Sequence, residues 1–146
     1  MLSRVYIFKS VKIETKKTYF FSYVRSNIYL HMKQCERTID NIDYLFVVGT
    51  CKEENQYLID KSQCHDLWFH ISNYPSCHVV CQIQNASKPN KKHLHKIIKQ
   101  GALCCKAHSK YKRDKNVDIT YATIGQLEST DKIGKVIVHN SKTITI

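Results

Sequence analysis

The side chains best suited to chemistry are concentrated in residues 64–81, which hold a carboxylate, an indole, three histidines and three cysteines. If the centre of this stretch forms a strand, alternation places an acid, an indole and an imidazole on one face: Asp66, Trp68 and His70. The residues of the opposite face would be apolar: Leu67, Phe69 and Ile71. His78 follows across a turn that contains Pro75.

Three kinds of site are compatible with these residues. A zinc site has its donors in Cys64, His70, Cys77, His78 and Cys81. No pair of them has the C-x₂-C or H-x₃₋₅-H spacing of a closed structural site. An acid–base site could use Asp66, His70 and His78, but no activated nucleophile or Gly-rich phosphate loop accompanies them. The pattern favours a hydrogen-bonded polar cluster that offers Trp, His and Tyr side chains to a ligand, without catalytic residue, metal or cofactor.

The charge of the chain indicates the ligand class. Lys and Arg number 23 against 12 acids, a formal net charge of +11. Residues 61–115 hold eleven of these cations and only two acids, so most of the excess is in one segment. Such a balance is typical of proteins that bind nucleic acids or anionic membrane surfaces. Only four cations are Arg, which favours contacts to the phosphate backbone over contacts to bases.

One long amphipathic helix is predicted from about Asn90 to Tyr111, with Asn90 as its N-cap. Its apolar arc has Gly101 at the centre, which predicts close packing against a sheet. Lysines of the opposite arc form a stripe without an acid: Lys92, Lys96, Lys99, Lys106 and Lys110. The stripe continues into Lys112, Arg113 and Lys115. An ordinary solvated helix face usually mixes signs, so the stripe and Arg113 are predicted to bind a polyanion.

The remaining elements are predicted strands, which makes the class α+β with a mixed, mainly antiparallel sheet packed against that one helix. The central strands are 44–49, 56–60, 67–71 and 78–83, and the C-terminal ones are 117–121, 135–139 and 143–146. Asn140 and Ser141 would form the turn of a hairpin between the last two strands. Strands are also predicted at 5–8, 18–24 and 28–32.

The length of 146 residues suits one domain, and the longest apolar runs are too short to cross a bilayer. Polar residues 40–43 suggest a boundary between an N-terminal extension (1–43), expected to be β-rich, and the main domain (44–146). Seven cysteines without a signal peptide are expected to be reduced in the cytoplasm. A mitochondrial transit peptide is conceivable in the first 13 residues, but their alternation favours a strand.

Four blocks in this order resemble the NFACT-R domain, the RNA-binding module of the NFACT proteins of ribosome-associated quality control. Residues 66–70 (DLWFH) followed by 75–80 (PSCHVV) look like its D-x-W-[FL]-H…P-[GS]-S-H-V-x motif. Residues 48–58 are similar to its G-R-[ND]-x-x-[QE]-N-[DE]-x-L stretch. The predicted helix followed by 117–121, and then 134–138 with 142–146, resemble its closing blocks.

The resemblance implies an RNA-binding role, with tRNA or rRNA as partner in a translation context and with the motif residues Asp66, Trp68, His70 and His78 at the surface. The chain departs from the family pattern at Thr50, where the family has Arg, and at Ser76-Cys77 in place of Gly-Ser. It looks like a stand-alone NFACT-R form. The alternatives are an RNA-processing or RNA-modifying enzyme that uses Asp66, His70 and His78, and a ribosome-docking adaptor without chemistry.

Overall fold

The computed structural model describes residues 32–83 and 88–146. Six strands form one sheet in the order β1-β2-β4-β3-β5-β8, and every neighbouring pair is antiparallel. Their bounds are β1 (Lys33–Ile39), β2 (Ile42–Gly49), β3 (Leu67–Ile71), β4 (His78–Cys81), β5 (Asp118–Thr123) and β8 (Lys142–Thr145). The strands predicted at 5–8 and 18–24, and nearly all of 28–32, lie outside the described residues.

The sheet separates two apolar clusters, because neighbouring residues of a strand point to opposite faces. In β3, Leu67, Phe69 and Ile71 belong to one cluster, whereas Trp68 belongs to the other. The strands β2 and β4 divide in the same way, with Phe46 and Val79 on the first side and Val47 and Val80 on the second. The predicted alternation along β3 is therefore confirmed.

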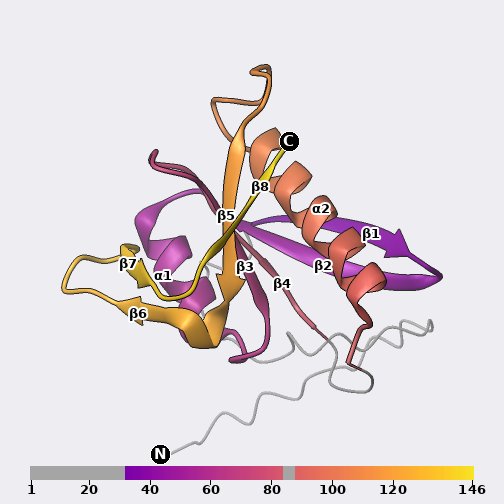
Figure 1. Cartoon of the computed structure of the whole chain (residues 1–146). Coiled ribbons are helices and arrows are strands. Elements are labelled where there is room, and N and C mark those ends of the chain that lie inside the picture. The colour runs from indigo at the N-terminus through magenta and orange to yellow at the C-terminus, as the bar shows by residue number, and fades with distance from the viewer. Residues whose placement is uncertain (1–31, 84–87) are drawn as a thin grey trace, which may run out of the picture.

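The helix α2 (Lys91–Ala107) covers the first face of the sheet (Figure 1). Asn90 is its N-cap, as predicted, and its side chain accepts a hydrogen bond from the main-chain N–H of His93. Gly101 lies so close to the sheet that a Cβ atom there would be 2.2 Å from Cζ of Phe69. The predicted close packing at Gly101 is confirmed, and the aromatic ring of Phe69 is what requires the glycine.

A second helix, α1 (Lys52–Lys61), and a small two-stranded sheet cover the other face (Figure 1). That sheet pairs β6 (Leu127–Ser129) with β7 (Val136–Val138) and follows a 3₁₀ turn, η2 (Ile124–Gln126). The prediction of one helix is therefore wrong, because residues 56–60 are helical. The helix signal was in the charges: acids occupy its first turn and Lys61 its last, which suits the helix dipole.

The C-terminal strands are not joined in the predicted hairpin. The strand β7 pairs with β6, whereas β8 pairs with β5 in the large sheet. Asn140 adopts a positive φ of 51° between them, so the chain turns there. The position of the turn was predicted correctly. It leads from the small sheet into the large one because β7 and β8 pair with β6 and β5 and not with each other.

Residues 40–43, taken as a boundary in the sequence, lie at the turn of the β1–β2 hairpin. Ile39 pairs with Ile42, and Asp40 and Asn41 have φ values of 49° and 64°, as in the tight turns that match strand twist. Residues 33–43 thus belong to the same sheet as β2. The described residues contain no helix long and apolar enough to span a membrane.

Candidate nucleic-acid interface

A pocket of about 760 Å³ opens on the face of the sheet that carries α1. Three separate segments form its walls: the start of α1 at residues 50–52, the β3–β4 turn at residues 73–76, and residues 134–136 before and in β7. Trp68, His70 and His78 lie on the sheet beneath them and line the pocket. Three of the four predicted motif residues are therefore brought together.

The three rings of the pocket contact one another. The rings of Trp68 and His70 are stacked, with centroids 5.6 Å apart and an interplanar angle of 4°. The ring of His78 meets both edge-on, with 5.2 Å between centroids in each pair. Trp68 and His78 are buried, and His70 is half-buried. His70 is thus the member of the group that a ligand reaches first.

Both histidines are held in the neutral form. Burial lowers the pKa of His78 to about 3, and the nearby His70 acts in the same direction. Burial also lowers the pKa of His70. Among the described residues, neither Nδ1 of His78 nor Nε1 of Trp68 has a hydrogen-bond partner, although both atoms are buried. A buried polar atom without a partner costs about 1–3 kcal/mol, so the fold holds these two rings in place at an energetic cost.

The start of α1 is held in place by its own polar side chains. The carboxylate of Glu54 accepts hydrogen bonds from the main-chain N–H of Thr50 (2.7 Å) and from its hydroxyl (2.9 Å). Asn55 Oδ1 accepts a hydrogen bond from the main-chain N–H of His78 (3.2 Å). Gly49 leaves room for this amide, since a Cβ there would lie 2.6 Å from Asn55 Oδ1. Asn55 is thus a positioning residue that no pattern in the sequence indicated.

Asp66, the fourth motif residue, does not face the pocket. Its carboxylate accepts hydrogen bonds from the main-chain N–H groups of Gln63 (2.8 Å) and Ile83 (2.9 Å). Burial raises the pKa of Asp66, and these two bonds oppose the rise. Asp66 precedes β3 and ties the end of α1 to the end of β4. The prediction that it shares a surface with Trp68 and His70 is therefore wrong, and so is its use to orient a catalytic histidine.

The cysteines considered for a zinc site in residues 64–81 do not meet. Cys64 is exposed, whereas Cys77 and Cys81 are buried on the α2 side of the sheet. The thiol of Cys77 donates to the main-chain oxygen of Cys105 (3.6 Å). Strand alternation separates Cys77 and Cys81 from His70 and His78, so this set cannot coordinate one ion.

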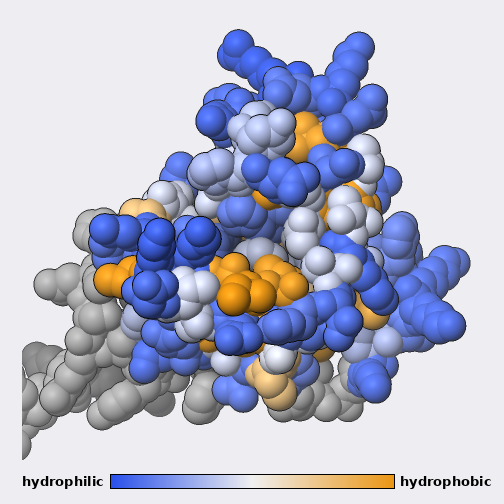
Figure 2. Space-filling view, turned by 60° about the vertical axis from the view of Figure 1, so that its left-hand side comes forward, coloured by the Kyte–Doolittle hydropathy of each residue, from blue (hydrophilic) through white to orange (hydrophobic). Residues whose placement is uncertain are grey.

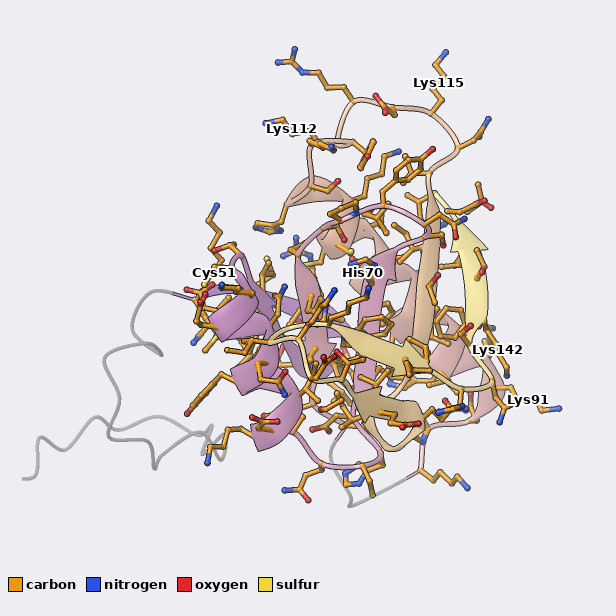
Figure 3. The ribbon with its side chains drawn as sticks, turned by 90° about the vertical axis from the view of Figure 1, so that its left-hand side faces the viewer. Cys51, His70, Lys91, Lys112, Lys115 and Lys142 are labelled. Carbon is orange, nitrogen blue, oxygen red and sulfur yellow. The ribbon has the colours of Figure 1, made fainter. Side chains whose placement is uncertain are left out.

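The basic residues after α2 lie beside the pocket. Tyr74 of the β3–β4 turn contacts Tyr111, with ring centroids 5.3 Å apart, and Nζ of Lys110 lies 5.3 Å from the ring of Tyr111. Lys112 and Lys115 project from the loop above His70 (Figure 3). Figure 2 shows hydrophilic side chains gathered over that end of the molecule, with an apolar area lower on the same face. We call residues 110–115 the basic segment.

The lysine stripe of α2 is divided by the fold. Lys96 forms an ion pair with Asp40 of the β1–β2 turn, and Nζ of Lys106 donates to the main-chain oxygen of Ile146 (3.0 Å). Lys92 and Lys99 are exposed, with no ion pair to any described residue. Lys110, and Arg113 in the same segment, lie beyond the end of α2. The predicted stripe is thus not one continuous set of free cations.

The charge network around Asp40 also involves a buried histidine. Asp40 Oδ2 lies 2.8 Å from Nδ1 of His93, and Nε2 of His93 lies 2.7 Å from the hydroxyl of Tyr44. Hydrogen bonds from Lys96 and His93 lower the pKa of Asp40. The network joins the β1–β2 hairpin to α2, which gives Lys96 a structural role.

The fold and the pocket define a basic α+β domain with a concave, ring-lined surface, and comparison with known proteins assigns it. The family model described as "NFACT protein RNA binding domain" matches residues 19–141. The chain therefore belongs to the NFACT RNA-binding domain family, and the resemblance seen in its motifs is confirmed. This membership supports an RNA-binding role.

Two curated relatives are similar to the chain in sequence. The chain is 27% identical over 111 residues to "Coiled-coil domain-containing protein 25 homolog" of Dictyostelium discoideum, covering 70% of this chain and 50% of that protein. It is 27% identical over 116 residues to coiled-coil domain-containing protein 25 of Mus musculus, covering 75% and 53%. The chain spans about half the length of these relatives.

The solved structure that matches is the C-terminal part of the fibronectin/fibrinogen-binding protein from Streptococcus suis. It has a TM-score of 0.64 and 22% sequence identity, and the match covers 84% of this chain and 48% of that one. At this identity the likeness shows the fold alone.

Proposed function

We propose that the domain binds a single-stranded segment of RNA, with a base in the pocket and the neighbouring phosphates along the basic segment. The observation that carries this proposal is the contact between Tyr74 and Tyr111, which places the segment next to the pocket wall. A ligand that spans both must combine a flat, partly apolar group with several negative charges. A nucleotide chain has this composition.

The shape of the site supports an unpaired strand over a duplex. RNA is read mainly where bases are unstacked and can stack on aromatic or imidazole rings. A volume of about 760 Å³ is in the range of small-molecule pockets and has room for a nucleotide. His70 offers the accessible ring, and the buried rings of Trp68 and His78 pack against it. Exposed Lys52 and Lys135 at the walls supply further positive charge.

Within a cell, the proposed partner is tRNA or rRNA in a translation context such as ribosome-associated quality control, in the cytoplasm. Family membership supports this proposal. A tRNA or rRNA presents unpaired bases in loops within a dense array of phosphates, which matches a pocket beside a lysine-rich segment. Alternatively, the domain docks on the ribosome through charge alone, and the pocket then has no part in binding.

The test compares three ligands for the full chain by fluorescence anisotropy at fixed salt: a short single-stranded oligouridylate, an RNA duplex of equal charge, and heparin. We expect the single strand to bind most tightly and to lose affinity in His70→Ala. Equal affinity for all three, unchanged in His70→Ala, would contradict a pocket for a base. Crosslinking in cells with sequencing of the bound RNA then tests the partner, and discrete tRNA or rRNA sites are expected.

A further inference from the structure

Two thiols and an imidazole meet on the α2 side of the sheet, away from the pocket. Cys35 comes from the edge strand β1, and Cys104 and His108 come from the end of α2. The ligand atoms of all three lie within 4.8 Å of one another. Sγ of Cys35 is 4.0 Å from Nε2 of His108, and Sγ of Cys104 is 3.8 Å from Nδ1 of the same ring.

The hydrogen bonding of His108 determines which of its ring nitrogens is free to bind a metal. Nδ1 lies 2.9 Å from the main-chain oxygen of Cys104. Because a carbonyl oxygen can only accept, Nδ1 carries the proton and Nε2 carries the lone pair. Nε2 is the nitrogen nearer to Cys35. Metal-bound histidines generally donate their second N–H to a carbonyl or carboxylate, which fixes the tautomer and the ring orientation.

We propose that Cys35, Cys104 and His108 bind a zinc ion. Thiolate and imidazole are the preferred donors of Zn²⁺, and four-coordinate sites with three protein ligands leave one position for water. At Zn–S of about 2.3 Å and Zn–N of about 2.1 Å, tetrahedral geometry places sulfur and nitrogen about 3.6 Å apart. The distance of 4.0 Å between Cys35 Sγ and His108 Nε2 is close to that value.

The proton and charge balance of the site is simple. Binding of Zn²⁺ converts two thiols into thiolates and releases their two protons, and the two negative charges balance the ion. His108 binds as the neutral imidazole. Affinity should therefore rise with pH.

The position of the site determines what the ion would do. The strand β1 is at the edge of the sheet and pairs only with β2 among the described strands. Zinc would join β1 directly to the last turn of α2, since Cys35 and Cys104 are 69 positions apart in the sequence. Such a link would stabilise the domain by holding its edge strand in place, independently of RNA.

The experiment uses the full chain, reduced and freed of metal, titrated with Co²⁺ and then with Zn²⁺. We expect one equivalent of Co²⁺ with a thiolate-to-cobalt charge-transfer band, which Zn²⁺ abolishes, and a higher melting temperature with Zn²⁺. Cys35→Ser is the test variant because Cys35 is only partly buried, and Cys64→Ser is the matched control. The affinity should fall by more than the 10–100-fold typical of a lost outer-shell partner in Cys35→Ser, and not in Cys64→Ser.

His108→Gln gives a second, independent variant and should also lose the band. Zinc binding that is equal in the wild type, Cys35→Ser and His108→Gln would overturn the proposal, since it would assign the ion to other thiols. Absence of binding by the reduced wild type would overturn it as well. Recovery of a Cys35–Cys104 disulfide in place of metal would do the same and would identify a redox pair instead.

Discussion

The two faces of the sheet are built from the same strands but end in different surfaces. On the α2 face, the inward residues of β2, β3 and β4 are apolar, and the helix packs so closely that Gly101 touches the ring of Phe69. On the other face, α1 and the β6–β7 hairpin leave a pocket lined by Trp68, His70 and His78. The long helix α2 packs closely on its face and forms a core with it. The shorter α1 and β6–β7 hairpin cover the other face only in part, which leaves the pocket open.

The two faces also differ in how many of their lysines are free to contact a ligand. The α2 side carries the predicted lysine stripe, but Lys96 and Lys106 have partners within the chain. The pocket side has fewer lysines on its helix, yet the basic segment lies against its wall through Tyr74 and Tyr111. Lysines that are paired within the chain are less available to a ligand, so we expect RNA to bind on the pocket side. Four predictions test this difference between the faces.

The largest effect is expected at the closely packed face. Gly101→Ala should lower the free energy of unfolding by about 2–3 kcal/mol, the upper range for overpacking a core, because its Cβ would be 2.2 Å from Cζ of the buried Phe69. Helix propensity alone would raise the stability by about 1 kcal/mol. Urea unfolding distinguishes the two outcomes. A more stable variant would show that α2 is not in close contact with the sheet. Leu103→Ala, on the exposed side of α2, is the control.

At the open face, His70→Ala should weaken binding of a single-stranded oligouridylate by about 2 kcal/mol, or roughly thirtyfold, the middle of the range for stacking of a base on a ring. His70 is half-buried and lines the pocket. The matched control is His95→Ala, an exposed histidine of α2. Fluorescence anisotropy measures both. Equal losses of RNA affinity in the two variants would contradict binding at the pocket face.

The stability of the domain should fall in acid because of the pocket histidines. Burial lowers the pKa of His78 to about 3 from 6.5, so the unfolded chain gains a proton below pH 6.5 that the folded chain does not. Protonation of the unfolded chain lowers the free energy of unfolding. The full free energy of unfolding is therefore present above pH 6.5 and is lost progressively toward pH 3. For one such group the loss between pH 7.5 and 5 is about 2 kcal/mol, and His70 shifts in the same direction.

Urea unfolding of the wild type and of His78→Gln at several pH values checks this prediction. The difference between the two proteins should narrow as the pH falls, because the variant has no imidazole at this position. His95→Gln, at an exposed ring, should keep the pH dependence of the wild type. A constant difference between wild type and His78→Gln would contradict the buried, neutral imidazole.

The smallest effect compares two pairs of exposed lysines. Reversing Lys112 and Lys115 to Glu should lower RNA affinity roughly tenfold at 0.15 M salt and reduce the log–log salt slope by about 1.4, if each contacts one phosphate of a single strand. Reversing Lys92 and Lys99 on α2 should change both quantities much less. All four side chains are exposed, so the melting temperature should stay constant. A larger loss of affinity on reversal of Lys92 and Lys99 would indicate that RNA binds on the α2 face.

Local features of this protein followed from local patterns in the chain. The period-2 alternation of residues 67–71 predicted which side chains share a face, and the period of α2 with its Asn90 cap predicted that helix. Gly101 at the centre of the apolar arc predicted the close approach to a sheet. These features depend on neighbours within a few residues, so the sequence contains their physical cause.

The sites depended on tertiary contacts. The motif predicted Trp68, His70 and His78 of the pocket, but not its walls at residues 50–52 and 134–136. It also did not indicate that Cys35 lies beside Cys104 and His108 in the proposed zinc site. Asp66 was misplaced because its partners are main-chain N–H groups, which any residue carries. Helix α1 was missed because its buried side includes the polar residues Glu54 and Asn55, which weaken the apolar period of the helix. Order within an element is set by short-range geometry, but which elements meet is set by the packing of the whole domain.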